Sequence, residues 1–189
     1  TVKIAGVIAK TRGSSLPRRR IAAGLGFLSE DRQREGLALD QSITDNLTYS
    51  RLRPFVRCGW LKHGERRRRA SDWLARLAVR CTGPDQQVLA LSGGNQQKVA
   101  IGRLLHQDAD VLLLDEPTRG VDVGSKVEIY RLIGALAARG KAVLFVSSYL
   151  PELLGVCDRV AVMARGKIAA DRAAADWTPR EVMAYAVGR

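Results

Sequence analysis

The sequence predicts an α/β fold with a mainly parallel sheet at its core. Three observations support this prediction. Residues 111–114 are a short apolar run that ends abruptly in Asp115 and Glu116, as a buried parallel strand does. Apolar residues recur at helical spacing between residues 125 and 139, and a second apolar run occupies residues 142–146. Strand, helix and strand at this spacing form a βαβ unit, which implies a right-handed crossover between parallel strands.

The chain between residues 42 and 107 has a different pattern. It is mostly helical, it is basic in its first half, and it lacks convincing strands. One amphipathic helix is predicted around Trp73, Leu74 and Leu77, and another over residues 94–106. We expect this region to be a helical subdomain inserted into the α/β core.

The C-terminal part of the chain continues the core and then ends in a helix. A third strand is predicted over residues 159–164. Thr178, Pro179 and Glu181 supply the capping residue, the first-turn proline and the third-position acid of a short terminal helix. The chain is therefore expected to comprise four segments: the N-terminal part of the core (1–41), the helical subdomain (42–107), the second part of the core (108–169) and a helical tail (170–189).

The net charge of +12 is concentrated in the first part of the chain. Residues 1–80 hold 18 Lys and Arg against 7 Asp and Glu, whereas residues 81–189 hold 13 against 12. Arginine runs at 18–20 and 66–69 predict solvated faces on short helices, with a polyanion or lipid-headgroup contact as the alternative. No aromatic residues interleave with these runs to stack on bases, so a nucleic-acid partner is not expected.

Other classes of protein are excluded by composition. The 3 cysteines are an odd number without a CxxC pair, which argues against a disulfide framework or a zinc site. No apolar run approaches the roughly 20 residues that a membrane span needs. The first residues have neither a starting Met nor a signal-peptide core, so we expect a fragment of a longer protein.

Two short motifs carry the chemistry. In nucleotide hydrolases, the first acid at a strand end such as Asp115 holds Mg²⁺, and a second acid such as Glu116 polarises the attacking water. The alternative is that the two acids cap a helix. Ser92, Gly93 and Gly94 precede a predicted helix, whose free N–H groups favour a phosphate. The alternative there is a simple turn with a helix cap.

The order of these motifs resembles that of the ATP-binding cassette (ABC) transporters. Residues 91–96 match their signature motif, residues 111–116 their Walker B motif and residues 120–122 their D-loop. Glu30 stands where the Q-loop Gln would be, and Ser148 where the switch His would be. The resemblance implies a P-loop-NTPase-like fold that uses ATP and Mg²⁺. It also implies three groups of site residues: Ser92, Gly93, Gly94, Gln96 and Asp122 for the nucleotide, Asp115 and Glu30 for the metal, and Glu116 and Ser148 for catalysis.

The resemblance narrows to one subfamily. Residues 29–32, 34–37, 91–98, 118–124 and 147–152 are similar to bacterial importers of ribose, galactose, xylose and autoinducer-2, whose ATPase subunit fuses two cassettes. A Glu in the Q-loop and a Ser at the switch position mark the second cassette. The implied partners are the other cassette, transmembrane permease subunits and, indirectly, a periplasmic sugar-binding protein. The implied location is the cytoplasmic face of the inner membrane.

The printed sequence contains no P-loop. That motif reads G-x-x-x-x-G-K-[ST], and neither Lys141 nor Lys167 has the required upstream Gly or the following Ser or Thr. The resemblance implies that the P-loop precedes Thr1, so that the first βα unit of the cassette is missing. In the resembled family each ATP lies between the P-loop of one cassette and the signature motif of the other. Ser92 would therefore meet ATP that the partner cassette holds.

Two functions follow from these motifs. The first is an ATPase module that couples ATP binding and hydrolysis to sugar import. The second is a non-catalytic interaction or regulatory module with a cassette fold. The missing P-loop separates the two hypotheses, because an isolated chain without it is expected to bind ATP poorly.

Overall fold

The computed structural model describes residues 2–4, 7–9 and 16–188. Part of the expected first segment (1–41) therefore lies outside the described residues. The chain divides into two compact units, Thr1–Leu144 and Phe145–Arg189, which are treated separately below. In the first unit, β1 (Val2–Ile4) pairs antiparallel with β2 (Val7–Ala9), and α1 (Leu16–Ala22) leads into the core sheet.

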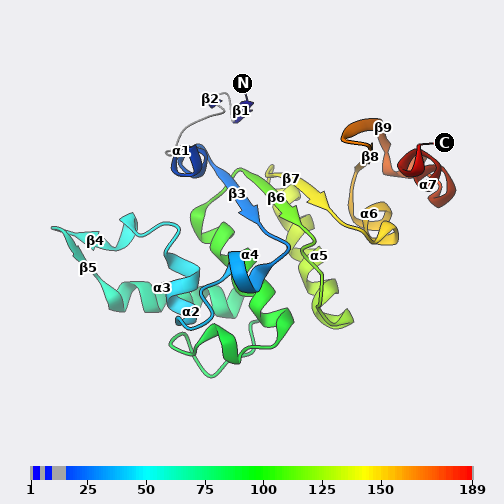
Figure 1. Ribbon diagram of the computed structural model, residues 1–189. Coiled ribbons are helices and arrows are strands. Elements are labelled where there is room, and N and C mark those ends of the chain that lie inside the picture. Colours follow the sequence, from blue (N-terminus) through cyan, green and yellow to red (C-terminus); the bar gives the residue numbers. More distant parts are fainter. Residues whose placement is uncertain (1, 5–6, 10–15, 189) are drawn as a thin grey trace. The chain divides into compact units, whose positions relative to one another are not determined.

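The core sheet has three strands in the order β3 (Leu25–Leu28), β6 (Val111–Asp115) and β7 (Ala142–Val146) (Figure 1). β3 and β6 run parallel, with Leu25 opposite Val111. α5 (Val123–Ala138) connects β6 to β7. The two predicted strands and the helix between them are confirmed, and so is the mainly parallel α/β core.

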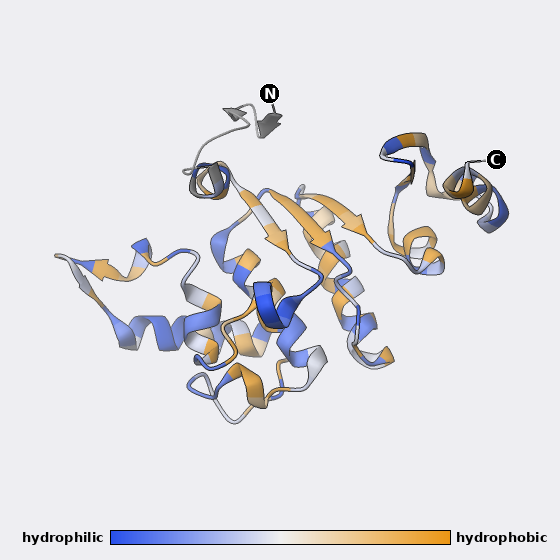
Figure 2. Ribbon diagram, in the orientation of Figure 1, coloured by the Kyte–Doolittle hydropathy of each residue, from blue (hydrophilic) through white to orange (hydrophobic). Residues whose placement is uncertain are grey.

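The sheet buries one face more deeply than the other. Leu28, Leu112 and Leu114 are at most 1% exposed. They lie on the face of Gly26, where a methyl group would come 3.3 Å from Leu104 of α4 (Gly93–Gln107). Because neighbouring strand residues point to opposite faces, Phe27 lies on the other face, where it is 53% exposed. We call this second face the open face of the sheet; Figure 2 shows how apolar its strands are.

The helical subdomain consists of α2 (Ile43–Thr48), α3 (His63–Arg76) and α4. The two predicted amphipathic helices correspond to α3 and α4. The expectation of no strands was wrong, because β4 (Val56–Arg57) and β5 (Trp60–Leu61) form a small antiparallel hairpin. Its two-residue turn has φ of 49° at Cys58 and 79° at Gly59, the backbone that tight hairpins require. Strands of two residues are too short to give an alternating pattern.

One arginine of the 66–69 run does not lie on a solvated face. Arg66 is 6% exposed, and its Nε donates to Thr48 Oγ1 at 3.0 Å. Its Nη2 donates to Asp45 Oδ1 at 2.5 Å, which joins α3 to α2. A buried guanidinium needs such partners, so the solvated-face prediction is corrected at this position.

The second unit contains α6 (Leu150–Val156), an antiparallel pair of strands β8 (Arg159–Ala164) and β9 (Lys167–Ala173), and α7 (Pro179–Val187). The predicted strand over residues 159–164 is confirmed. The predicted capping box is present, since Thr178 and Glu181 exchange both hydrogen bonds. The unit has its own small core: Val160, Val162, Trp177 and Val182. β9 crosses the expected segment boundary at residue 170, and the division into four segments stays a prediction.

Short helical turns complete the described chain, at Arg32–Gly36, Arg53–Phe55, Val88–Ala90 and Ala174–Asp176. Among the described residues, no helix combines the length and the apolar character that crossing a bilayer would demand.

Candidate functional site

The N-terminus of α4 carries the predicted phosphate-binding motif. Ser92 is the N-cap residue, with extended backbone at φ −62° and ψ 157°, but its side chain makes no capping hydrogen bond. Instead, Ser92 Oγ accepts a hydrogen bond from Asn95 Nδ2 at 2.9 Å. The first turn also contains no acidic residue. The first-turn amides are therefore left without a side-chain cap, in an arrangement that suits an anion.

The two glycines of this motif are required by close packing. A methyl group on Gly93 would lie 2.9 Å from the carbonyl oxygen of Gly120. A methyl group on Gly94 would lie 2.8 Å from Ser125 Cβ and 3.2 Å from Asp122 Oδ2. The signature loop thus packs directly against the segment that follows the Walker B strand. The structure brings four of the five predicted nucleotide-binding residues together here: Ser92, Gly93, Gly94 and Asp122.

Gln96 departs from the expectation for a nucleotide-binding side chain. It is 4% exposed, and its Nε2 donates to the carbonyl oxygen of Val88 at 3.2 Å. Its side chain supports the 88–90 turn from inside the subdomain, because it lies on the buried side of the first helical turn. Asn95, which the sequence did not single out, lies on the more exposed side of this turn. Its Oδ1 accepts a hydrogen bond from the backbone N–H of Arg80 at 3.0 Å.

Asp122 acts as the N-cap of α5. Its Oδ1 accepts from the backbone N–H of Ser125 at 3.0 Å. Hydrogen bonds from the backbone and then the side chain of Ser125 lower the pKa of this exposed carboxyl. The negative charge is favourable at a helix N-terminus. Asp122 therefore has a clear structural role beside the glycine loop.

The acids at the end of β6 lie where the sequence predicts. Asp115 is the last residue of the strand, and both Asp115 and Glu116 are half-buried. Glu116 has φ of 46°, which is rare for a residue with a side chain. Such strained backbone tends to collect at functional sites. The next residues turn the chain sharply, and Thr118 is 2% exposed.

Glu30 has a different neighbour from the one expected of a metal ligand. Its carboxylate forms an ion pair with the guanidinium of Arg119. Across the described parts of the chain, no three His, Cys, Asp or Glu side chains gather in a way that could hold a metal ion. A magnesium site at the end of β6 would therefore depend on nucleotide oxygens as well as on Asp115.

Ser148 belongs to the second unit, at an exposed bend between β7 and α6. Next to it, Ser147 Oγ donates to Glu152 Oε2 at 2.7 Å and accepts from Tyr149 N at 3.0 Å. Glu152 is 5% exposed, so this bend is anchored by a buried carboxylate. The switch position thus lies on a well-supported turn.

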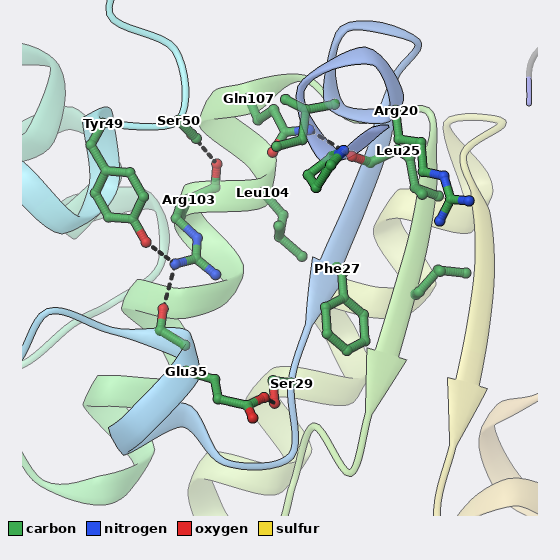
Figure 3. Close-up of a pocket in the computed structure, with 14 residues that line it drawn as sticks. Arg20, Leu25, Phe27, Ser29, Glu35, Tyr49, Ser50, Arg103, Leu104 and Gln107 are labelled. Atoms are coloured by element: carbon green, nitrogen blue, oxygen red, sulfur yellow. Dashed lines mark hydrogen bonds between the residues drawn. The ribbon is translucent and has the colours of Figure 1, made fainter. Parts of the chain in front are cut away.

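A cavity of about 940 Å³ lies beside β3, lined by residues of the open face and of α4 (Figure 3). Leu25, Phe27 and Leu113 contribute its apolar floor. On its wall, Arg103 donates to the hydroxyl of Tyr49 and to the carbonyl oxygen of Gly36. Arg103 is 8% exposed and donates both bonds from Nη1, and the surface that lines the cavity is mainly apolar.

Comparison with known proteins agrees with this geometry. Residues 4–119 match the ABC transporter family. Over 179 residues the chain is 49% identical to "Ribose import ATP-binding protein RbsA 1" of Streptomyces avermitilis, and over 172 residues it is 46% identical to "Ribose import ATP-binding protein RbsA" of Pseudomonas putida. These alignments cover 93% and 91% of this chain but 34% of each relative. The chain thus spans about a third of the length of the curated relatives it matches.

A solved structure shares the fold. It is described as the "Dimeric structure of a post-hydrolysis state of the ATP-binding cassette MJ0796 bound to ADP and Pi". The TM-score is 0.74 at 22% identity, with 89% of this chain and 71% of that chain covered. Together with the family match and the relatives, this likeness shows an ABC nucleotide-binding fold. The chain belongs to the ABC transporter family and is related to ribose import ATP-binding proteins.

Proposed function

We propose that this chain is an ATP-binding cassette of a sugar importer and that it couples ATP binding and hydrolysis to carbohydrate import. The single observation that carries the proposal is the glycine loop at the start of α4. Its first-turn amides have no side-chain cap, and Gly93 and Gly94 let the loop pack closely against the segment after β6. The names of the aligned relatives support ribose or a similar sugar as the cargo.

The ATP at this loop is held by a partner cassette. The printed sequence has no P-loop to cradle the β- and γ-phosphates of its own nucleotide. The residues that do fit a phosphate are Ser92, Gly93 and Gly94, and Ser92 is exposed. This chain therefore acts as the second cassette of a two-cassette subunit and donates its signature helix across the interface.

The open face of the sheet supports a preceding βα unit that carries the P-loop. Phe27 is 53% exposed on that face, beside the cavity of about 940 Å³. Burying such apolar surface stabilises a fold by about 25 cal/mol per Å². Adding the preceding residues of the natural protein should raise the melting temperature by several degrees and protect the amides of β3 and β6 from hydrogen exchange. Unchanged melting would contradict this part of the proposal.

The acids at the end of β6 serve the site that this missing unit would complete. Mg²⁺ prefers oxygen ligands and is commonly held by one or two carboxylates plus substrate phosphates, so Asp115 fits it. When bound, Mg²⁺ neutralises charge on the phosphates. Glu116 accepts a proton from the attacking water. Ser148 is too short and insufficiently basic to replace a switch His, which weakens this site compared with the partner's.

The remaining partners follow from the family. They are transmembrane permease subunits and, indirectly, a periplasmic sugar-binding protein. The cassette works at the cytoplasmic face of the inner membrane. There its surplus of positive charge in residues 1–80 is favourable next to anionic lipid.

The decisive experiment compares two substitutions in the reconstituted transporter. Ser92→Arg blocks the phosphate-binding loop, so it should abolish most ATP turnover. Glu116→Gln affects only the weaker site, so it should reduce turnover less. If Glu116→Gln reduced ATP turnover more than Ser92→Arg, the signature loop would not be this chain's main contribution to ATP turnover.

A non-catalytic module is the second candidate, because the 189 residues lack a P-loop and carry Ser at the switch position. Calorimetry with Mg-ATP on the purified chain distinguishes the two roles. We expect no micromolar binding by the chain alone. Turnover that is restored by the preceding P-loop unit supports the first function, and its absence in the complete subunit supports the second.

A further inference from the structure

A polar cluster joins two segments that are almost ninety residues apart. Arg32 Nη1 donates to the carbonyl oxygen of Arg119 at 2.8 Å, and Arg32 Nη2 donates to that of Gly120 at 3.5 Å. In return, the side chain of Arg119 pairs with Glu30. Residues 30–32 and residues 119–120 thus each provide one arginine, and each segment binds the arginine of the other. We call Glu30, Arg32, Arg119 and Gly120 the crossed-arginine cluster.

The same cluster touches the signature loop. A methyl group on Gly93 would lie 2.8 Å from Arg32 Nη2 and 2.9 Å from the carbonyl oxygen of Gly120. The guanidinium of Arg32 therefore fills the space between the start of α4 and the turn after β6. A side chain at position 93 would displace this guanidinium, so the glycine and Arg32 depend on each other for their places.

The chemistry of Arg32 suits this position. Its flat guanidinium can reach two carbonyl oxygens at once, which a lysine ammonium cannot do in the same geometry. Burial lowers the pKa of Arg32, against the nearby charge of Asp31, which raises it. Its Nε is buried and has no hydrogen-bond partner. A buried N–H without an acceptor costs stability. The guanidinium is therefore held in place by the two bonds from Nη1 and Nη2 to the carbonyl oxygens.

We propose that Arg32 is a positioning residue for the signature loop, and that Glu30 acts through Arg119 instead of as a magnesium ligand. This inference rests on the proposed function, since it concerns how the phosphate-binding loop is held in place. In this structure the carboxylate of Glu30 has an arginine partner, and within the described residues it does not gather with two other potential metal ligands. Glu30 at the Q-loop position thus replaces a metal contact with a link to Arg119, the residue just before the D-loop.

The first test measures hydrogen exchange of residues 117–122 in the intact protein that carries this chain. Glu30→Gln and Arg119→Gln should each speed exchange about two- to fivefold, the factor expected for a partly exposed ion pair. The double variant should be no faster than either single one, and the charge swap E30R/R119E should return exchange to within about twofold of the original. Fully multiplicative effects, or a swap that recovers nothing, would overturn the proposed pair.

The second test concerns Arg32. Arg32→Lys keeps the charge but replaces two donor atoms, Nη1 and Nη2, with a single nitrogen on a shorter chain that carries no flat group, so exchange should rise in residues 117–122 and at the start of α4 together. Arg34→Lys is the matched control, because the side chain of Arg34 is 89% exposed and lies outside the cluster. If both variants behave alike, Arg32 has no positioning role.

The third test asks whether Glu30 acts as the partner of an ion pair or as a ligand of the metal. In the assembled transporter, Glu30→Ala, which removes every side-chain oxygen, should leave the Mg²⁺ concentration for half-maximal ATP hydrolysis within about twofold of the original, while kcat falls. A tenfold rise in that concentration would restore Glu30 as a metal ligand. The hydrogen-exchange measurement on residues 117–122 needs no nucleotide. It therefore tests the cluster independently: if Ser92→Arg leaves ATP turnover intact, the proposed function fails but the exchange result is unaffected.

Discussion

Replacing Asp45 with Asn tests the charge pair that joins α2 to α3. The side chain of Arg66 is 7% exposed, whereas that of Asp45 is 42% exposed. Asn keeps the shape of the acceptor but removes its charge. The buried guanidinium of Arg66 is then left with neutral acceptors only, one of them Thr48 Oγ1.

The magnitude follows from these exposures. Breaking a fully buried pair costs about 3–5 kcal/mol, whereas an exposed pair is worth about 0.2–1 kcal/mol. Since one partner is buried and the other is partly exposed, we expect a loss of about 2 kcal/mol. That corresponds to about a 30-fold increase in the opening equilibrium of the two helices.

Hydrogen exchange of the α2 and α3 amides measures this opening directly. The chain provides a matched control in Asp85→Asn. Asp85 pairs with Arg67 at the same 2.5 Å, but the two side chains are 61% and 62% exposed. We expect the control to change exchange by less than about fivefold. Equal effects of the two Asn variants would refute the argument from burial.

The same pair predicts a pH dependence. Burial acts to raise the pKa of Asp45, but hydrogen bonds from Ser42 and Arg66 outweigh it, so the pKa is lowered overall. The stabilisation is therefore complete above the ordinary Asp value of about 3.9 and is lost as the pH falls through the lower folded value. The original protein and the Asn variant should differ at neutral pH and converge in acid.

Three further substitutions test other parts of the molecule. Gly134→Ala lies in α5 with nothing within 4 Å of the new methyl group, so it should stabilise the first unit by about 0.5–1 kcal/mol in urea unfolding; destabilisation would contradict the open space. Trp177→Phe removes the 3.0 Å bond from Nε1 to Val160 O and should speed exchange in β8 by a factor equivalent to about 1–3 kcal/mol, whereas unchanged β8 would deny its anchoring role. Burial lowers the pKa of His106, so stability should fall as the pH drops below about 6.5, and His106→Gln should show a smaller fall.

Much of the fold could be predicted because its signals are local. The acid-tipped strand before Asp115 and the capping box at Thr178 each lie within a few consecutive residues. The burial of Arg66 could not be predicted, because its partner Asp45 lies 21 residues away and a run of four arginines indicates only charge. Local patterns identify elements, and only the packed structure identifies partners.

The candidate site divides in the same way. Ser92 and the two following glycines were recognised from their order and from the helix behind them. The burial of the Gln96 side chain could not be predicted, because the sequence does not indicate which side of the first turn is buried. Arg32 was overlooked because its acceptors, the carbonyls of Arg119 and Gly120, are backbone groups that leave no trace in the sequence.

The hairpin of β4 and β5 carries an exposed cysteine that a thiol-reactive probe can label. Its turn presents Cys58 to solvent, whereas Cys81 and Cys157 are half-buried. Burial, reinforced by the charges of Asp158 and Glu152, raises the pKa of Cys157 and suppresses its reactive thiolate. A maleimide dye will therefore react faster at Cys58 than at Cys157. Trp60 is 77% exposed on the adjoining strand, so a dye at Cys58 lies next to an exposed indole and can report local motion of the hairpin without an engineered cysteine.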